Sequence, residues 1–362
     1  MTLDFFREEL AETAAALAAP GTGLLAADES TGTIGKRFEA IGVDNSEENR
    51  RAFRTLLATT PGLAEHISGV ILYEETLFQD STVTAGAGPS PLVDLFRDQG
   101  IRVGIKVDLG VEALAGALPG ETWCTGLKGL AERAERYYAR GARFAKWRAV
   151  LRISSDGCPS ELSVRENAWG LARYARTCQE QGLVPIVEPE ILMDGDHDIA
   201  TTAAVQEWVL RTVYGALAVN GVFLEGSLLK PSMTTAGADC PERSSAGQVG
   251  EFTLRTLART VPAAVPAILF LSGGLAEEDA SICLNEINRA AHQAGAPWHL
   301  GFSFGRALQH SCLQGWAGSD LVAGQQALLA RARANGEASL GTYQPGSQPS
   351  SDASLFVANY SY

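Results

Sequence analysis

The sequence predicts an α/β protein in which a (β/α)8 TIM barrel is followed by a flexible C-terminal tail. Eight short apolar runs recur along the 362 residues, with amphipathic stretches of helical length between them. Nearly uninterrupted apolarity in a strand indicates burial on both faces, as in parallel sheets that helices cover. Eight strand–helix units in a chain of this length favour a closed barrel, with a doubly wound open sheet as the alternative.

Each apolar run is a predicted barrel strand, and the longer amphipathic stretches are predicted helices. In chain order, the strands are expected at 23–27 (GLLAA), 68–73 (SGVILY), 101–107 (IRVGIKV), 143–147 (RFAKW), 183–190 (LVPIVEPE), 221–230 (GVFLEGSLLK), 267–272 (AILFLS) and 299–304 (HLGFSF). Helices are expected at 127–140, 165–181, 198–219, 247–259 and 277–293. Because no linker composition divides the chain, residues 1–334 are predicted to form a single catalytic domain.

The last part of the chain, residues 335–362, resembles neither strand nor helix. It is rich in Gly, Ser, Gln and Pro and then ends in SLFVANYSY. A disordered end is the ordinary interpretation of such a composition. The aromatic and apolar finish suggests instead a mobile tail that docks, and we expect it to reach the active site.

Composition excludes several classes of protein. The net charge of −13 argues against a nucleic-acid partner, although it leaves room for a phosphorylated small molecule in a local cationic pocket. The six cysteines form no Cys-x-x-Cys pair and the histidines no close ligand pair, so we expect no metal, no cofactor and a reducing cytoplasm. Residues 1–20 do not resemble a signal peptide, and the longest apolar run, 261–271, is too short to span a membrane.

Lysine is scarce, and its positions are unusual. Only five of the 29 basic residues are lysines, and Lys106, Lys146 and Lys230 each lie on or at the end of a predicted strand. Unlike arginine, lysine can lose its proton and then attack a carbonyl carbon to form an imine. The pattern suggests an imine-forming enzyme, whereas the ordinary interpretation is that these lysines merely end strands.

Polar side chains gather at the C-terminal ends of the predicted strands, where a barrel carries its chemistry. Residues two apart on a strand face the same side, so Lys146 with Arg148, and Glu188 with Glu190, are expected to enter one cavity. Lys230 has the apolar neighbours of an activated amine, and the two glutamates could shuttle the protons that imine formation requires. The other candidates at strand ends are Asp28, Ser30, Lys106, Asp108, Glu225, Ser272, Gly273, Gly274, Ser303, Gly305 and Arg306.

Two Ser–Gly loops provide a signal for phosphate binding. They read LSGGLAEED after the seventh predicted strand and FSFGRALQ at the eighth, where Arg306 begins a helix. The corresponding loops of barrel enzymes often bind phosphate through backbone amides, although a pair of ordinary glycine turns would look similar.

Seven motifs occur in order at the predicted strand ends and together resemble the class I fructose-bisphosphate aldolases. They are LLAADESTGTIGKRF, GIKVDLG, FAKWRAVL, GLVPIVEPEIL, LEGSLLKPSM, FLSGG and FSFGRALQ. The resemblance covers nearly the whole chain and is loose around 80–100 and in the tail before Ser354. Thr33 stands where the family commonly has Ser, and Lys128 where it commonly has an acid.

The resemblance implies a role for each matching catalytic residue. Lys230 falls on the position of the imine lysine, Glu188 on that of the acid–base glutamate, and Glu190 on that of its supporting carboxylate. Asp28 would orient the substrate and handle the proton of the C4 hydroxyl, and Lys146 would support the carbinolamine steps electrostatically.

The resemblance also implies binding residues at the two ends of the substrate. Those toward the 6-phosphate are Ser30, Thr33, Lys106 and Arg148. Those around the 1-phosphate are Ser272, Gly273, Ser303, Gly305 and Arg306. Tyr362 matches the family's mobile C-terminal tyrosine.

The expected activity is therefore reversible cleavage of fructose 1,6-bisphosphate to dihydroxyacetone phosphate and glyceraldehyde 3-phosphate. It would serve glycolysis, gluconeogenesis or the Calvin cycle, through a lysine Schiff base and without a metal. The resemblance implies a cytoplasmic homotetramer. The alternatives are another imine-forming barrel enzyme such as a transaldolase, and a non-catalytic scaffold.

Overall fold

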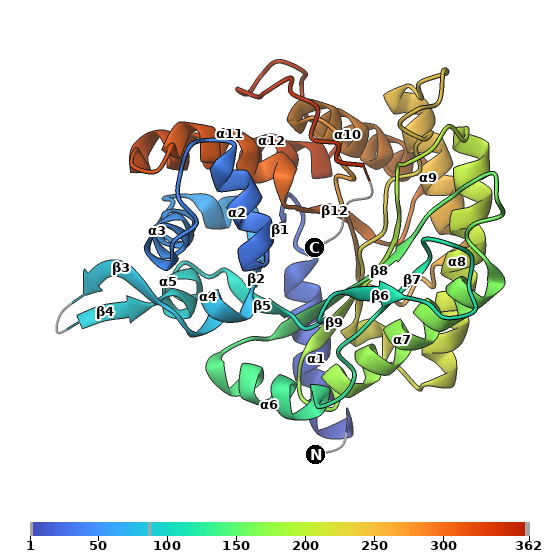
Figure 1. The fold of residues 1–362 in the computed structure, drawn as a ribbon, viewed down its shortest axis with the longest axis horizontal. Coiled ribbons are helices and arrows are strands. Elements are labelled where there is room, and N and C mark those ends of the chain that lie inside the picture. The colour runs from blue at the N-terminus through green and yellow to red at the C-terminus, as the bar shows by residue number, and fades with distance from the viewer. Residues whose placement is uncertain (1–2, 86–87, 359–362) are drawn as a thin grey trace.

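The computed structural model describes residues 3–85 and 88–358, and it confirms the predicted barrel (Figure 1). Eight parallel strands close in the order β1-β12-β11-β10-β9-β8-β5-β2. They are β1 (Gly23–Ala27), β2 (Ile67–Leu72), β5 (Arg102–Lys106), β8 (Phe144–Leu151), β9 (Val184–Ile191), β10 (Leu228–Leu229), β11 (Ala267–Phe270) and β12 (His299–Phe304). Each of the eight apolar runs contributes one of these strands, so the open-sheet alternative is excluded.

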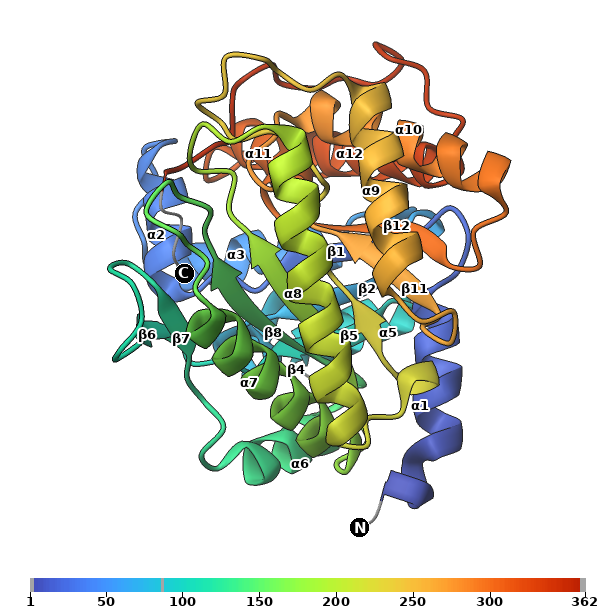
Figure 2. The same ribbon diagram turned by 90° about the vertical axis from the view of Figure 1, so that its right-hand side faces the viewer.

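Helices surround the barrel, and the five predicted ones are present within a few residues of the expected bounds. In chain order the helices are α1 (Leu3–Leu17), α2 (Thr31–Glu39), α3 (Glu47–Ala58), α4 (Glu74–Phe78), α5 (Leu92–Asp98), α6 (Leu130–Arg140), α7 (Glu161–Gln179), α8 (Ile199–Val219), α9 (Ala246–Thr260), α10 (Glu277–Ala294), α11 (Arg306–Trp316) and α12 (Leu321–Ser339). Figure 2 shows α7, α8 and α9 side by side over the outer face of the strands. Two hairpins, β3 (Asp80–Ala85) with β4 (Gly88–Pro91) and β6 (Val111–Ala113) with β7 (Thr122–Cys124), are additions to the barrel.

The sixth strand is shorter than predicted. The run at 221–230 was expected to be extended throughout, but it contains the 3-10 turn η2 (Leu224–Gly226) before the two-residue β10. The side chain of Gln179 is fully buried and bonds the backbone of Phe223 and Gly226, which takes the place of sheet hydrogen bonds there. Glu225 is consequently exposed in this turn rather than placed among the candidates in the barrel.

Helix α1 closes the N-terminal end of the barrel, a role that the sequence pattern did not indicate. Its apolar face, with Phe6, Leu10 and Leu17, forms one buried cluster with strand residues such as Phe144 and Leu228. Burying this face against the strands removes apolar surface from water and plugs that end. The C-terminal ends of the strands remain available for the candidate site.

The tail begins later than residue 335. Helix α12 continues to Ser339, and Asn335 within it is fully buried, so the segment after the last helix starts at Leu340. In Figure 1 this segment, drawn in red, runs from α12 back to the barrel opening. In the part of the chain that the structure describes, none of the helices has both the length and the apolar character of a membrane span.

Candidate active site

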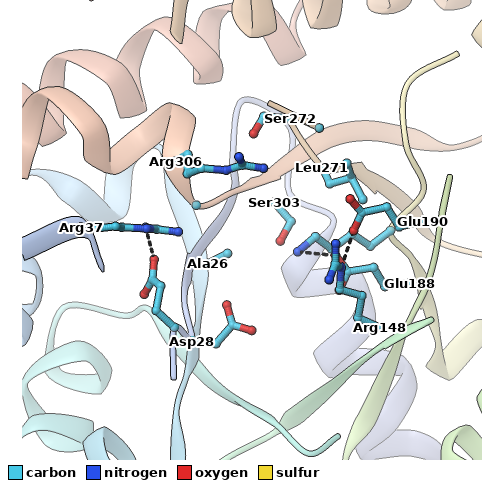
Figure 3. Close-up of a pocket in the computed structure, with 14 residues that line it drawn as sticks. Ala26, Asp28, Arg37, Arg148, Glu188, Glu190, Leu271, Ser272, Ser303 and Arg306 are labelled. Atoms are coloured by element: carbon cyan, nitrogen blue, oxygen red, sulfur yellow. Dashed lines mark hydrogen bonds and ion pairs between the residues drawn. The ribbon is translucent and has the colours of Figure 1, made fainter. Parts of the chain in front are cut away.

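Strand register brings the charged residues of neighbouring strands together. Lys106 on β5 lies opposite Lys146 on β8, and Arg148 lies opposite Glu188 on β9. Because side chains two apart share a face, Lys146 with Arg148 and Glu188 with Glu190 face the barrel interior as pairs. Figure 3 shows Asp28, Arg148, Glu188 and Ser303 around one pocket. Asp28 directly follows β1, and the other three lie on β8, β9 and β12.

At the centre of the site, two lysines alternate with two carboxylates. The Lys230 Nζ lies 3.1 Å from the Glu188 Oε1, and the Lys146 Nζ lies 3.4 Å from the Glu188 Oε2. Lys146 also forms an ion pair with Asp28, at 2.8 Å from its Oδ2. None of these four residues is more than 2% exposed. Glu188 is thus positioned to exchange protons with Lys230 while Lys146 holds both carboxylates.

The carboxylate of Asp28 remains ionised at neutral pH. Burial by itself would raise its pKa, but the nearby ammonium groups of Lys146 and Lys230 outweigh burial and lower the pKa to about 2. Asp28 is therefore a charged hydrogen-bond acceptor throughout the physiological pH range.

Backbone contacts beyond β10 hold Lys230 in place. The Lys230 amide donates to the Val187 carbonyl at 2.8 Å. Two residues later, the Ser232 hydroxyl both accepts from the Ile191 amide and donates to the Ile191 carbonyl, at 3.0 and 2.9 Å. The buried Gln206 side chain donates to the Ser232 carbonyl at 2.7 Å. These bonds continue the link between β9 and β10 past the end of the very short strand.

Tyr174 supports the neighbouring pair of strands from outside the barrel. Its buried hydroxyl lies 3.0 Å from the Ala145 carbonyl on β8 and 2.7 Å from the Ile186 carbonyl on β9. Its ring stacks on Trp147, with 5.4 Å between the ring centroids. Burial raises the pKa of Tyr174 well above its usual value, so the hydroxyl stays a donor. Tyr174 thereby connects the backbones of β8 and β9 directly before Lys146 and two residues before Glu188.

The second charged pair is Arg148 with Glu190. Burial would raise the pKa of Glu190, but the adjacent guanidinium of Arg148 outweighs burial and keeps that pKa below its usual value. The negative charge of Glu190 is therefore paired with the positive charge of an arginine rather than of a lysine. Lys106 has its own partner, since its Nζ lies 2.6 Å from the Asp108 Oδ1.

The two Ser–Gly loops lie at the pocket as predicted. Gly273 adopts a left-handed conformation, with φ +61°, that favours glycine in the tight turn after β11. Ser303, at the end of β12, is 1% exposed, and its hydroxyl has no hydrogen-bond partner among the described residues. Gly305 and Arg306 form the start of α11, where backbone amides favour an anion.

Ten of the fifteen residues to which the family resemblance assigns a role line this pocket. They are Asp28, Arg148, Glu188, Glu190, Lys230, Ser272, Gly273, Ser303, Gly305 and Arg306. Lys146 forms ion pairs with two of these lining residues, Asp28 and Glu188. Lys106 lies opposite Lys146 in the pairing of β5 with β8. Ser30 caps α2 by accepting the Thr33 amide. Tyr362 lies outside the described residues.

Four residues of the site were not selected from the sequence. Glu29, which follows Asp28, is buried and binds Arg37 and also Arg54, the latter at 2.7 Å. The Gln309 amide donates to the same carboxylate at 3.0 Å. The sequence contains a signal for Glu29, namely a second acid directly after a buried strand, but Arg54 and Gln309 lie on distant helices. Arg37 and Glu29 line the pocket.

A larger cavity of about 410 Å³ adjoins the pocket between α2, α11 and the tail. Thr33, Arg37 and Arg306 line it, together with Leu355 and Phe356. The Arg306 guanidinium donates to the Leu355 carbonyl. Gly274 faces the backbone of Phe356 so closely that a Cβ there would lie 2.9 Å from the Phe356 Cα. The tail therefore lies against the opening of the site.

The fold and this site define a (β/α)8-barrel enzyme with a buried lysine–carboxylate centre and a pocket suited to phosphate. Comparison with known proteins identifies the family. The model of the family described as fructose-bisphosphate aldolase class-I matches residues 9–362. The chain therefore belongs to the class I fructose-bisphosphate aldolases, which are lyases acting on a phosphorylated sugar.

Individual relatives support the same conclusion. Cytosolic fructose-bisphosphate aldolase 4 of Arabidopsis thaliana is 54% identical over 358 residues, covering 98% of this chain and 89% of that protein. Fructose-bisphosphate aldolase 1 of Toxoplasma gondii is 54% identical over 361 residues, covering 98% and 96%. The Plasmodium falciparum aldolase, crystallised with TRAP and a small-molecule inhibitor, is 51% identical with a TM-score of 0.90, covering 94% of this chain and 96% of that one. Other relatives are named chloroplastic.

Proposed function

We propose that this protein cleaves fructose 1,6-bisphosphate reversibly to dihydroxyacetone phosphate and glyceraldehyde 3-phosphate, through an imine on Lys230. The observation that supports this proposal is the pairing of Lys230 with Glu188 at 3.1 Å, in a centre where both side chains are almost fully buried. An amine beside a carboxylate that can take and return its proton is the arrangement that imine chemistry needs.

The first half of the reaction builds the imine. The neutral amine of Lys230 attacks the C2 carbonyl carbon, and the resulting carbinolamine loses its hydroxyl as water with a proton supplied by Glu188. The product is an iminium ion at C2. Lys146, which pairs with both Glu188 and Asp28, stabilises the negative charge of whichever carboxylate is ionised.

The second half breaks the carbon–carbon bond. Asp28 accepts the proton of the C4 hydroxyl as the C3–C4 bond breaks, and the bonding electrons move into the iminium to form an enamine. Glyceraldehyde 3-phosphate leaves, the enamine is protonated at C3, and hydrolysis frees Lys230. The iminium serves as the electron sink, so the mechanism does not require a metal ion or a cofactor.

Phosphate binding would occur at the two ends of the pocket. We assign the 1-phosphate to the Ser–Gly loops, namely to Ser272, Gly273, Ser303, Gly305 and Arg306. The unpartnered hydroxyl of Ser303 and the start of α11 support this assignment. We assign the 6-phosphate to Ser30, Thr33, Lys106 and Arg148, which lie at the start of α2 and on β5 and β8.

The tail would supply the proton for the enamine. We propose that Tyr362 reaches the site and protonates C3, after which the resulting iminium ion is hydrolysed. The contacts of Leu355 and Phe356 with the pocket loops support this proposal, because they bring the tail to the opening of the site.

Borohydride reduction in the presence of dihydroxyacetone phosphate and excess EDTA tests the proposal. We expect a single substrate mass on the peptide containing Lys230, with turnover unaffected by the chelator. Labelling of another lysine would overturn the imine assignment. Loss of activity that a divalent ion restores would indicate a metal-dependent reaction instead.

Replacement of Arg306 tests the 1-phosphate assignment. Arg306→Ala should lower kcat/KM for fructose 1,6-bisphosphate by about 10- to 150-fold, since a hydrogen bond to a charged group contributes roughly 1.5–3 kcal/mol. Competitive inhibition by inorganic phosphate should weaken as well. Arg165→Ala, which removes an exposed arginine paired with Glu161, is the control and should change neither quantity. Unchanged kinetics in Arg306→Ala would place this residue outside the phosphate site.

We further propose that the enzyme is a cytoplasmic homotetramer of glycolysis or gluconeogenesis. The cytosolic relatives support the location, whereas the chloroplastic ones leave the Calvin cycle as the alternative pathway. The tetramer is an expectation from the family, and size-exclusion chromatography with light scattering measures it directly.

A further inference from the structure

The described part of the tail, residues 340–358, has two segments that differ in how many hydrogen bonds attach them to the rest of the protein. Its first part, residues 340–351, is bonded to side chains of α10 and α12. Its second described part, residues 352–358, is mostly exposed and approaches the barrel at Leu355 and Phe356. The two parts meet at Ser351.

Glu277, the first residue of α10, connects the tail to α11. Its side chain is fully buried. One carboxylate oxygen accepts the Ser311 amide at 2.9 Å, and the other accepts both the Ser311 hydroxyl at 2.5 Å and the Ser351 amide at 2.9 Å. Ser311 lies on α11, the helix that begins with Arg306. A single carboxylate therefore bonds the end of the first tail segment to the helix that carries a pocket residue.

Glu278 attaches the tail at a second point. Its Oε1 accepts the Tyr343 hydroxyl at 2.7 Å and the Gly346 amide at 2.6 Å. These two donors, the Gly346 amide foremost, hold the pKa of Glu278 below its usual value, so the attachment carries a full negative charge at neutral pH. The Tyr343 amide also donates to the Asn285 side chain at 2.9 Å.

A buried arginine lies beneath these attachments. Arg331, on α12, is fully buried and donates to the Glu277 carbonyl at 2.8 Å and to the Ser281 hydroxyl at 2.6 Å. It also reaches the Pro349 carbonyl at 3.4 Å. Buried polar groups bonded to one another in this way form a rigid unit, because breaking any one bond leaves a buried group unsatisfied.

We propose that Glu277 and Glu278 fasten the base of the tail, so that the arm able to enter the site pivots at Ser351 rather than at Leu340. Glu277 is then a positioning residue for the protonation step, acting through the tail. The inference rests on the proposed role of the tail in that step. Tyr362, the proposed proton donor, lies 11 residues after Ser351 and 22 residues after Leu340. The concentration of a tethered group at its target falls roughly as the −3/2 power of tether length, so the nearer pivot raises it about threefold.

Insertions on the two sides of the pivot test this proposal. A flexible Gly-Ser insertion of about six residues directly after Ser351 lengthens the free arm, so exchange of the C3 proton of dihydroxyacetone phosphate with solvent should slow about twofold. The same insertion after Gly346, between the two attachments, should leave that exchange unchanged. Single-turnover cleavage should be the same in both variants. Equal slowing by the two insertions would show that the tail moves as one unit from Leu340.

Two substitutions then test the attachment itself. Glu277→Gln should make the insertion after Gly346 behave like the one after Ser351, because the pivot moves back to Gly346. Ser351→Pro removes the donated amide, and with it the hydroxyl that accepts the Ala353 amide at 3.3 Å, but leaves the carboxylate and its bonds to α11 in place. It should therefore have the same effect without endangering the fold. Glu161→Gln, which breaks an exposed ion pair with Arg165 at the first residue of α7, is the control and should have no effect. If neither Glu277→Gln nor Ser351→Pro alters the insertion series, Glu277 does not set the pivot.

Amide hydrogen exchange separates a failure of this inference from a failure of the proposed function. Residues 343–351 should exchange more slowly than 352–358, and Glu277→Gln should expose the Ser351 amide while Tyr343 stays protected. Equal exchange rates across 343–358 in the unaltered protein would overturn the attachment. Deleting Tyr362 tests whether the tail donates the proton. If exchange of the C3 proton is unaffected by the deletion, the tail is not the proton donor. The amide hydrogen exchange of residues 343–358 then decides by itself where the tail is fastened.

Discussion

Lys230→Arg is expected to abolish turnover, with kcat falling by on the order of 10⁴-fold or more, as for loss of other covalent nucleophiles. The guanidinium of arginine keeps a positive charge beside Glu188, so the centre retains its charge balance. It cannot form an imine with the C2 ketone, however, and the substrate adduct should disappear together with the activity. Steady-state kinetics and mass analysis after borohydride treatment measure the two effects.

A matched control is available elsewhere in the chain. Lys128 is exposed, so Lys128→Arg makes the same chemical change away from the site and should leave both activity and adduct intact. Full activity in Lys230→Arg would contradict the imine mechanism, whatever the control shows. Loss of activity with the adduct retained would mean that another lysine is labelled.

Glu188→Gln is expected to slow the reaction by about 10²- to 10⁴-fold, the range for removal of a general acid–base group. The amide has nearly the same shape but cannot carry a proton between Lys230 and the carbinolamine. It also removes the anion that lies between two buried ammonium groups, at 3.1 and 3.4 Å. The rate of imine formation, followed by rapid-quench borohydride trapping, should therefore fall together with kcat.

Glu190→Gln is the control for this prediction. Glu190 lies on the same strand and the same face as Glu188, but it pairs with Arg148 rather than with a lysine. Its replacement should affect imine formation much less. If Glu190→Gln slows imine formation as strongly as Glu188→Gln does, the acid–base role cannot be assigned to Glu188 alone.

The strands and their polar ends could be predicted because they depend on local pattern. One face of each barrel strand packs against helices, and the other faces the barrel interior. Both faces are therefore apolar along most of the strand, so each of the eight runs could be recognised in the sequence. Alternation along β8 and β9 placed Lys146, Arg148, Glu188 and Glu190 on one face before any tertiary contact was known. The strand ends then located the other candidates, except Thr33 and Tyr362, which came only from the family resemblance. Ten of the fifteen residues to which that resemblance assigns a role line the pocket.

Other features depend on partners that are distant in sequence. Strand β10 has only two residues because the side chain of Gln179, at the end of α7, forms hydrogen bonds with the backbone of Phe223 and Gly226 just before the strand. Glu29 belongs to the site because Arg37, Arg54 and Gln309 surround its carboxylate. No local pattern identifies such partners, since each lies on a separate helix.

The barrel, the succession of its strands along the chain, and the acids, lysines and Ser–Gly loops at the strand ends all follow from the sequence pattern. The pairing of each ammonium group with its carboxylate, the packing of α1 against the far end of the barrel, and the bond from the Ser351 amide to Glu277 became known only from the tertiary structure. Periodicity reports only which face of a helix or strand is buried. Ion pairs and hydrogen bonds depend instead on distances of about 3 Å between atoms that the fold alone brings together.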